Sequence, residues 1–374
     1  MAINPLHPEF IIKQRRIALG DRALVAIAAH VEVRSMLRAA AQLMAHGLDD
    51  ILIGSYARRV SIWPGKDVDV LGRLMADTIE TLGPDLAYQL FLDALEPYAA
   101  QGRLTPQPRS LKVEFGPTRA PAVASIREAA KEYRWESERV ERVVASLGDV
   151  VFEFSVDVVP AVIWGDHYGI PDLARLATGE RYRTGQWRKT NPVKLTELTQ
   201  KRNRSPLIAG VGAYVRTVRG VKQVKAYHLP DAKPSSLYYE LILHEGFASG
   251  AIAGDTWADI TASALRYIAS RLATATVDPV CDPVLVQPYL PAPSAIELEA
   301  ARAVFDDQAR RAERACSESR CQAAIGWRAV FGGNAKWDQV FPLPDGCRGS
   351  GAAMGAATAN LASGGTSERS FGAS

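Results

Sequence analysis

Two aspartates in one short stretch are the residues whose types and spacing most clearly suggest chemistry. Asp67 and Asp69 lie in the run Asp67-Val68-Asp69-Val70-Leu71, which predicts a β-strand although aspartate is depleted in strands. Residues two apart in a strand point to the same face, so the carboxylates would project together. Two carboxylates this close repel each other unless a positive charge lies between them. It therefore indicates a site for a hard divalent cation such as Mg²⁺, and a solvated pair on an edge strand is the alternative.

A third aspartate, Asp157, stands in the strongly β-forming stretch 150–161, where its neighbours are almost all apolar. We expect Pro160 to end this strand. An unpaired charge there would be costly, so Asp157 needs a cation, either a nearby Lys or Arg or a metal ion. With Asp67 and Asp69 it makes a trio that can hold two divalent ions. Two-metal sites activate an attacking hydroxyl and stabilise the leaving group when phosphorus is attacked in line.

The turn before the aspartate pair suits a phosphate group. The run Leu48 to Ile53 predicts a buried strand, and Gly54-Ser55 follows it directly. If a helix begins at this point, its free N–H groups face the ligand. Glycine lets the backbone approach closely, and the Ser55 hydroxyl adds a polar contact. An ordinary strand-to-helix turn explains the same two residues.

Basic side chains in the second half of the chain are candidates to meet that phosphate. They recur every three residues on a helix predicted over 212–228, and each step of three turns by about 60° around the helix. Only two or three can therefore address one site, and a solvated basic face is the alternative. The turn at Gly54-Ser55 could hold the tail of a nucleoside triphosphate, and Ser236, at the start of the next predicted helix, could close on that triphosphate from the second lobe. An ordinary helix start is the alternative for Ser236. The basic residues are Arg216, Arg219, Lys222 and Lys225, of which Lys222 and Lys225 are best placed for triphosphate oxygens.

The elements that must position these residues fall into two parts. Residues 1–20 are expected to be irregular, and Asp21 is expected to cap a long helix over 22–46. Strands and helices alternate up to about residue 170, and helical patterns dominate from about 190 to 331. This order predicts an α+β protein with a catalytic lobe (1–170), a helical lobe (171–345) and an active-site cleft between them. Residues 346–374 are rich in Gly, Ala and Ser and are expected to form a flexible tail.

Composition narrows the class of protein. The 374 residues are 47% hydrophobic and 23% charged, with a formal net charge of +3, as in globular proteins. This mildly basic charge permits anionic substrates and argues against a broad nucleic-acid-binding surface. No apolar run approaches the ~18 residues of a spanning helix, and no signal peptide is recognisable, so a cytoplasmic protein without a membrane partner is expected. The four cysteines suggest no disulfide framework and fit a reducing cytosol.

The order and spacing of these motifs resemble the pattern of a known superfamily. Gly54-Ser55, then Asp67-Val68-Asp69 after an eleven-residue gap, then Asp157 in a later strand, is the pattern of the DNA polymerase β-like nucleotidyltransferases. The closer similarity is to the cGAS/DncV-like nucleotidyltransferases (CD-NTases) of bacterial anti-phage signalling (CBASS). It extends to stretches 190–203, 221–227 and 327–344, and so covers nearly the whole folded chain.

The resemblance implies a fold and a reaction. The fold would be a polymerase β-like lobe with a mixed, twisted sheet, a long helix over 22–46 bridging the lobes, and a helical C-terminal lobe. The enzyme would make a cyclic di- or trinucleotide second messenger from nucleoside triphosphates, ATP among them, and release pyrophosphate. The product would activate an effector in anti-phage defence. Two Mg²⁺ ions, with Mn²⁺ as a substitute, would be held by Asp67, Asp69 and Asp157, and the triphosphate by Gly54, Ser55, Lys225 and Ser236.

One position departs from the family pattern. Relatives such as cyclic GMP-AMP synthase follow the equivalent of Ser236 with a base-stacking tyrosine, whereas Leu237 stands here and Tyr238 and Tyr239 come next as substitutes. Base identity is therefore left open. Ring size and linkage are open as well, because they depend on the shape of the pocket and on how a linear intermediate reorients in it. In many such systems the C-terminal tail is conjugated to a target, which implies a regulatory partner. The alternatives are linear nucleotidyl transfer to RNA, protein or a small molecule, and a non-catalytic nucleotide-binding protein of this fold.

Overall fold

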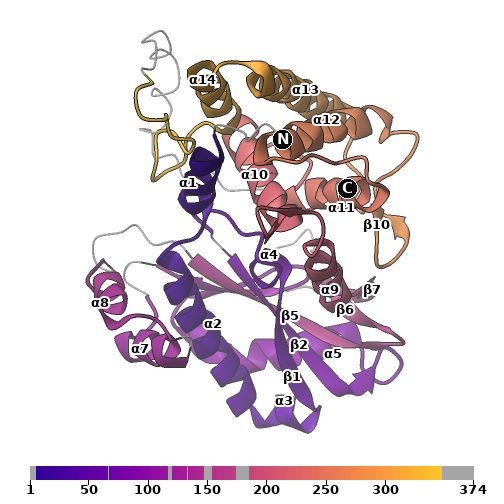
Figure 1. Ribbon diagram of the computed structural model, residues 1–374. Coiled ribbons are helices and arrows are strands. Elements are labelled where there is room, and N and C mark those ends of the chain that lie inside the picture. The colour runs from indigo at the N-terminus through magenta and orange to yellow at the C-terminus, as the bar shows by residue number, and fades with distance from the viewer. Residues whose placement is uncertain are drawn as a thin grey trace.

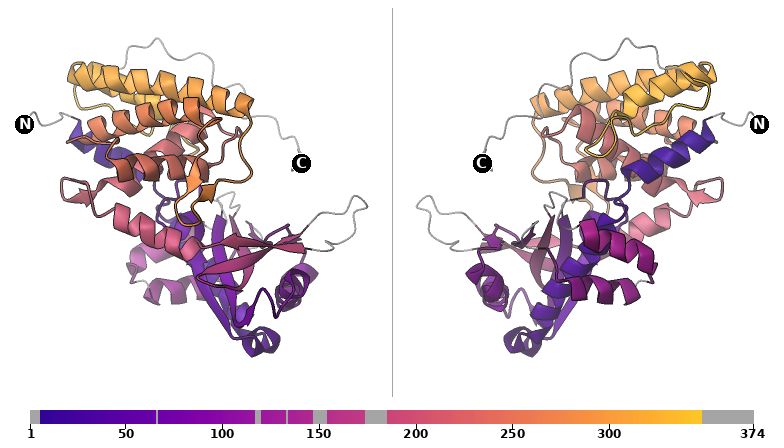
Figure 2. Two further views of the ribbon diagram at one scale, coloured as in Figure 1. Left: turned by 90° about the vertical axis from the view of Figure 1, so that its right-hand side faces the viewer. Right: turned by 90° about the vertical axis from the view of Figure 1, so that its left-hand side faces the viewer.

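The protein has a sheet lobe below and a helical lobe above it, as Figures 1 and 2 show. The computed structural model describes residues 6–65, 67–116, 120–132, 134–146, 154–173 and 185–347. The sheet and the helices around it share one hydrophobic core, and the later helices share a second. The predicted α+β architecture with a helical C-terminal part is therefore confirmed. The predicted tail falls almost entirely on residues 348–374, which lie outside the described ranges.

The described strands of the sheet lobe form a mixed, seven-stranded sheet. Its order is β1-β2-β5-β4-β3, and β6 pairs with β5 and then with β7. Strands β2 and β5 run parallel, while the other pairs are antiparallel. The strands are β1 (Leu48–Ile53), β2 (Asp67–Thr78), β3 (Leu104–Pro106), β4 (Leu111–Phe115), β5 (Phe154–Trp164), β6 (His167–Leu173) and β7 (Gly185–Thr190).

The two faces of this sheet have different neighbours. Because side chains alternate along a strand, Val68 and Val70 of β2 point to the opposite face from Asp67 and Asp69. The valines are fully buried in the core that includes α2 (Arg22–Ala39) and α5 (Pro84–Ala94). The helical lobe lies on the other side, with the short helix α4 (Gly54–Ala57) between it and the sheet (Figure 1).

The remaining helices complete the two lobes. Those of the sheet lobe are α3 (Ala41–Ala45), α6 (Glu96–Ala100), α7 (Val123–Glu132) and α8 (Ser137–Ser146). Those of the helical lobe are α9 (Pro192–Arg202), α10 (Ala213–His228), α11 (Ser236–Ser249), α12 (Trp257–Thr274), α13 (Ala295–Ser317) and α14 (Arg320–Phe331). Two small hairpins connect helices of this lobe. One lies between α9 and α10 and consists of β8 (Leu207–Ile208) and β9 (Val211–Gly212), and the other lies between α12 and α13 and consists of β10 (Cys281–Asp282) and β11 (Gln287–Pro288). Across the described residues, no helix combines the length and apolar character needed to span a bilayer.

The N-terminal segment is helical, which corrects the expectation that residues 1–20 are irregular. Helix α1 (His7–Ile17) has Pro8 in its first turn, where the missing N–H of proline costs nothing. Phe10 lies edge-on to Trp327, with ring centroids 5.0 Å apart. The first helix of the chain therefore packs in the core of the helical lobe.

Two boundary predictions were also wrong. The helix expected over 22–46 breaks at Ala40, where ψ is 107°, and continues as the short helix α3. At the other end, Asp21 occupies the N-cap position of α2 as predicted, although its side chain makes no capping hydrogen bond and accepts one from Arg139 at 2.6 Å. Pro160 does not end its strand, because β5 continues to Trp164. On one side of β5, the pairing with β4 ends at Val158 and the pairing with β6 begins at Val162. Pro160 lies in this gap, so its missing N–H costs no hydrogen bond on that side.

A disulfide joins Cys321 of α14 to Cys347, which corrects the expectation from the cysteine pattern. The cross-link spans 26 residues and ties the end of the described chain to the helical lobe. Cys281 and Cys316 are free thiols. Four cysteines without a recognisable spacing do not reveal which pair the fold brings together.

Reducing this disulfide is expected to lower the free energy of unfolding by roughly 3 kcal/mol, because a loop of this length restricts the unfolded chain by about that amount. Urea unfolding with and without a thiol reductant measures the difference. The variant Cys321→Ser/Cys347→Ser is the control and should unfold identically in both conditions. Equal stability of the oxidised and reduced wild-type chains would contradict the expectation.

Candidate active site

The three aspartates come together at one end of the sheet. In the parallel register of β2 and β5, Asp69 lies opposite Asp157 and Asp67 lies opposite Ser155. On the other side of β2, Ile53 pairs with Asp69. The turn that begins at Gly54 is therefore next to the acid pair. The strand parity predicted from sequence places Asp67, Asp69 and Asp157 on one face.

Gly54 is required by its position beside Asp69. Its φ of +70° lies in the left-handed region, and a Cβ built at this residue would collide with the Asp69 carboxylate. Backbone hydrogen bonds then close residues 54–60 into what we call the Gly54 turn, with Arg58 N bonded to Gly54 O at 3.2 Å and Val60 N to Ser55 O at 2.9 Å. The backbone of this turn is thus held against the acids.

Two further serines contact the predicted site residues and were missed from sequence. Ser155 donates its hydroxyl proton to Asp67 Oδ1 at 2.7 Å. The hydroxyl oxygens of Ser55 and Ser61 lie 2.9 Å apart and share a hydrogen bond. Ser155 could have been inferred, since it lies two residues before Asp157 in the same strand. Ser61 carries no such signal, because its contact depends on how the turn closes.

The acids are crowded and largely removed from water, which shifts their protonation. Burial, followed by the charges of Asp69 and Asp67, raises the pKa of Asp157 to about 7. Burial and Asp67 raise the pKa of Asp69 to about 6, against the opposing charges of Arg58 and Lys222. Asp157 Oδ1 is buried without a hydrogen-bond partner. This end of the sheet therefore carries negative charge that the protein only partly neutralises.

Hard carboxylate oxygens of this kind fit Mg²⁺. The orphaned Asp157 Oδ1 and the mutual repulsion of the acids are what a cation would relieve. Within the described ranges, no three His, Cys, Asp or Glu side chains are arranged to hold a metal ion as they stand. The three carboxylates thus fit Mg²⁺ by their chemistry, but their side chains would have to turn toward the ion to bind it.

Without metal, Asp157→Asn is expected to stabilise the chain by up to roughly 4 kcal/mol at pH 8. The folded-state pKa of Asp157, about 7, lies above its ordinary 3.8, so the folded chain binds this proton more tightly than the unfolded chain. The wild type therefore loses stability as pH rises from about 4 through 7, and a neutral asparagine does not. Urea unfolding in chelator at pH 8 and pH 5 tests this, and the gain should shrink at pH 5. A destabilised or pH-independent variant would count against the crowded-acid account.

A buried ion cluster, not anticipated from sequence, lies beside Asp69. Arg58, at the end of α4, donates to both carboxylate oxygens of Glu240 on α11, at 2.7 and 3.3 Å. Lys222 of α10 lies 3.5 Å from the same carboxylate. All three side chains are less than 10% exposed. Burial alone would raise the pKa of Glu240, but the two cations outweigh it and lower that pKa, so the glutamate is ionised.

The basic residues of α10 diverge, as their spacing of three predicts. Lys222 reaches the Glu240 cluster, whereas Lys225 is half-buried and donates to the Pro230 carbonyl at 3.3 Å. Arg219 donates to the Arg59 carbonyl at 2.8 Å. Arg216 lies over the Trp257 ring. Ser236 is the first residue of α11, as expected.

The tyrosines expected to substitute for a base-stacking residue are in the core instead. Tyr238 and Tyr239 are 2% and 1% exposed. Tyr238 packs edge-on against Tyr289, and Tyr239 packs against Phe305. Neither presents a ring face to a nucleobase, because the apolar side of α11 on which they lie is buried in the helical lobe.

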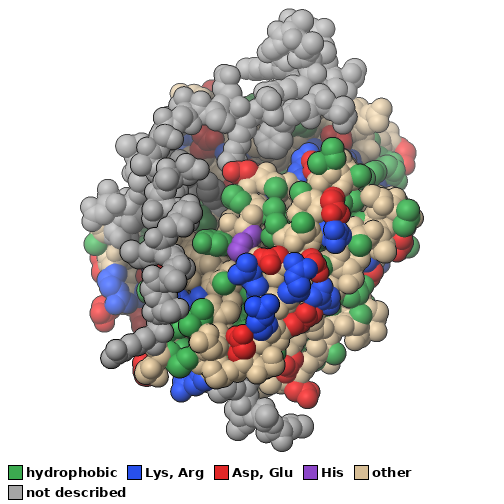
Figure 3. Space-filling model, turned by 90° about the horizontal axis from the view of Figure 1, so that it is seen from above, with side chains coloured by type: hydrophobic (Ala, Val, Ile, Leu, Met, Phe, Trp, Pro, Cys, Tyr) green, Lys and Arg blue, Asp and Glu red, His purple; other side chains and the backbone are tan. Residues whose placement is uncertain are grey.

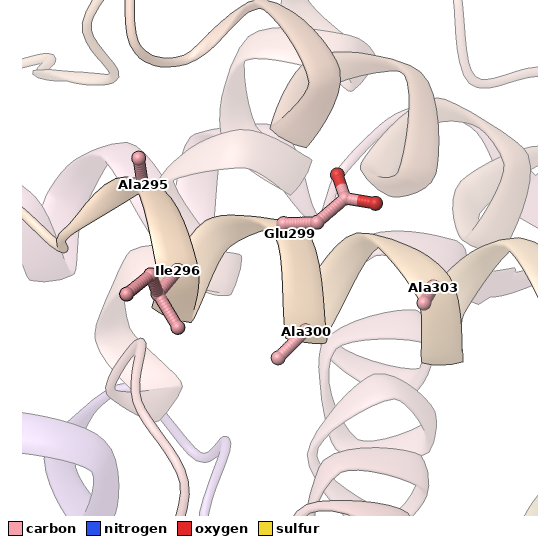
Figure 4. A pocket seen from close by; sticks show the side chains of 5 residues that line it. All are labelled: Ala295, Ile296, Glu299, Ala300 and Ala303. Carbon is pink, nitrogen blue, oxygen red and sulfur yellow. The ribbon is translucent and has the colours of Figure 1, made fainter.

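Other surfaces of the helical lobe have a different character. Seen from above, Lys and Arg side chains mix with Asp and Glu side chains (Figure 3). Arg266 of α12, for example, pairs with Asp306 and Glu313 of α13. A shallow hollow of about 520 Å³ runs along α13 (Figure 4), and none of the predicted site residues lines it. Its walls are Ala295, Ile296, Glu299, Ala300 and Ala303.

No protein-family model matches the sequence, and no curated protein matches it either. Solved structures do. CdnG of Bradyrhizobium diazoefficiens, described as a CD-NTase in complex with GTP, superimposes with a TM-score of 0.59 at 14% identity over 87% of this chain and 96% of its own. This chain has the CD-NTase fold. Two further CD-NTase structures agree. CdnC of E. coli MS115-1 with ATP gives a TM-score of 0.54 at 14% identity, covering 90% of this chain and 98% of its own.

The second is Vibrio cholerae DncV, a cyclic AMP-GMP synthase solved with the linear intermediate 5′ pppA(3′,5′)pG. Its TM-score is 0.52 at 12% identity, covering 86% of this chain and 88% of its own. The matches span both lobes, so the CD-NTase fold extends across nearly the whole described chain. At such identities the likeness concerns the fold, and the predicted CD-NTase fold is confirmed.

Proposed function

We propose that this protein is a Mg²⁺-dependent nucleotidyltransferase that makes a cyclic di- or trinucleotide from nucleoside triphosphates and releases pyrophosphate. The observation that carries the proposal is the register of β2 and β5, which sets Asp69 opposite Asp157 beside the Gly54 turn. The CD-NTase fold adds support, because CdnG, CdnC and DncV were solved with GTP, ATP and a linear dinucleotide, respectively.

Different residues of the chain would bind the metal ions and the triphosphate. Asp67, Asp69 and Asp157 would hold the ions. Bound there, Mg²⁺ would supply the activation of the attacking hydroxyl and the neutralisation of the leaving pyrophosphate. The Gly54 turn would present backbone N–H groups and the Ser55 hydroxyl to the triphosphate. Catalysis of this type depends on positioning and charge neutralisation, so no covalent nucleophile is needed.

The helical lobe would bind the triphosphate from the opposite side. Lys222 already lies near the end of the sheet that carries the three aspartates, because its charge acts on Asp69. Lys225 makes one long hydrogen bond to a backbone carbonyl, which a phosphate oxygen could replace. Ser236 at the start of α11 would complete the contacts. An effector that responds to the product, and a regulatory or conjugating partner for the C-terminal tail, are proposals that rest on the resemblance alone.

The test is incubation with the four nucleoside triphosphates and Mg²⁺, followed by phosphatase. A cyclase releases one pyrophosphate per nucleotide joined, measured before phosphatase is added, and leaves a nucleotide that resists phosphatase. Products that phosphatase degrades would indicate linear transfer. A requirement for added RNA, protein or small molecule would identify the acceptor of that transfer. No pyrophosphate under any condition would indicate a non-catalytic protein.

A further inference from the structure

Glu240 lies where three elements from both lobes meet. Its carboxylate accepts hydrogen bonds from Arg58, which ends α4 beside the sheet, and it pairs with Lys222 of α10. Its own helix, α11, is held to α10 by a further contact, since Tyr214 donates its hydroxyl proton to the Glu240 carbonyl at 3.2 Å. The side chain of Glu240 is 1% exposed. Both the side chain and the backbone of Glu240 are therefore fixed.

Stability alone does not account for this arrangement. A buried ion pair adds little net stability compared with apolar side chains of similar size, because both charges lose their hydration. What a two-point Arg–carboxylate contact does provide is direction, since the planar guanidinium can meet two oxygens in only a few orientations. Arg58 is thereby held at a defined angle at the end of the Gly54 turn.

The Gly54 turn is connected to the helical lobe twice. Arg58 reaches Glu240 on α11, and the next residue, Arg59, accepts a hydrogen bond from Arg219 on α10. Arg59 has a φ of 59°, a left-handed conformation that a non-glycine residue adopts only when its surroundings hold it. The two contacts thus set the position of the turn relative to both helices.

Within the cluster itself, positive charges outnumber negative charges by one. Arg58 and Lys222 are cations and Glu240 is the one carboxylate they share. Asp69 lies directly against Gly54, at the start of the turn in which Arg58 stands. A triphosphate held between the Gly54 turn and α10 would meet this surplus charge. Without Glu240, the two buried cations would repel each other and lose their common anchor.

We propose that Glu240 is a positioning residue that locks the Gly54 turn to the helical lobe and aims Arg58 and Lys222 at the triphosphate. The inference rests on the proposed nucleotidyl transfer, because it concerns the same site. It predicts a selective defect. Ligands with a triphosphate should lose affinity when Glu240 is changed, whereas a nucleoside monophosphate, which lacks the outer phosphates, should not.

Isothermal titration with α,β-methylene ATP and with AMP, each with Mg²⁺, tests this on the full chain. Glu240→Gln is expected to weaken binding of the triphosphate analogue about tenfold or more and binding of AMP less than about twofold. Glu245→Gln is the matched control. This residue lies on the same helix but pairs with Arg271 and Tyr267, so its variant should bind both ligands like the wild type.

A second variant covers the case in which Glu240→Gln does not fold, since it leaves two buried cations unbalanced. Glu240→Asp keeps the negative charge but shortens the side chain, so it should fold, hold Arg58 and Lys222 less firmly and show the same selective loss. Wild-type affinity for the analogue in the variants, or an equal loss for both ligands, would overturn the positioning role alone. A wild type that does not bind the analogue would overturn the proposed function and this inference with it.

Discussion

Asp67→Asn and Asp157→Asn are each expected to reduce pyrophosphate release by roughly a thousandfold or more, with the fold intact. Asparagine keeps the shape of the side chain but removes the charge that would hold a divalent ion. Losing several kcal/mol of transition-state stabilisation corresponds to a factor of this size. Initial rates with saturating nucleoside triphosphates and Mg²⁺ measure the loss. Circular dichroism should show unchanged secondary structure.

A matched carboxylate distinguishes loss of the site from loss of charge in general. Asp172 lies on β6 of the same sheet and pairs with Arg109 at 2.9 Å, away from the acid trio. Asp172→Asn should keep its rate within about twofold. If either site variant retains more than about a tenth of the wild-type rate, the acid trio is not the catalytic centre.

Gly54→Ala is the second change with a large expected effect, a loss of roughly a hundredfold in kcat/KM. The new Cβ would collide with the Asp69 carboxylate, so either the turn or the acid has to move. Displacements on the order of 1 Å at a reacting centre cost about this factor. The left-handed φ of +70° adds a backbone penalty of about 1 kcal/mol to folding.

Gly102→Ala separates the collision from the backbone penalty. Gly102 also has a left-handed φ, +63°, but nothing lies within 4 Å of a Cβ built there. This variant should lose similar stability in urea unfolding and keep its kcat/KM. Equal activity of the two alanine variants would mean that the close approach of Gly54 to Asp69 has no part in catalysis.

The features predictable from sequence are those that depend on local periodicity. The alternation in β2 and β5 predicted that Asp67 and Asp69 share a face, and the spacing from Gly54 to Asp67 indicated a strand, a turn and a second strand. The drift of the basic residues on α10 followed from helix geometry. Each of these inferences needs only a few neighbouring residues, and the structure agrees with them.

The features that sequence could not predict depend on which distant segments pack together. Glu240 stands in an apolar helix, and only the contacts of the Gly54 turn with α10 and α11 show that its partner is Arg58, 182 residues away. Helix α1 contains several polar residues, and its role appears only when Phe10 meets Trp327. The burial of Tyr238 and Tyr239 likewise depends on which side of α11 faces the helical core.

Mass spectrometry of the product isolated after incubation with the four nucleoside triphosphates and Mg²⁺ decides whether this protein is a cyclase. The expected product has the mass of a cyclic di- or trinucleotide, with one phosphate per nucleoside and no terminal phosphate. The same product should be missing with Asp67→Asn. Only linear products with a 5′-triphosphate would show that the protein does not cyclise, and the same product from the Asp67→Asn variant would show that the acid trio is not the catalytic centre.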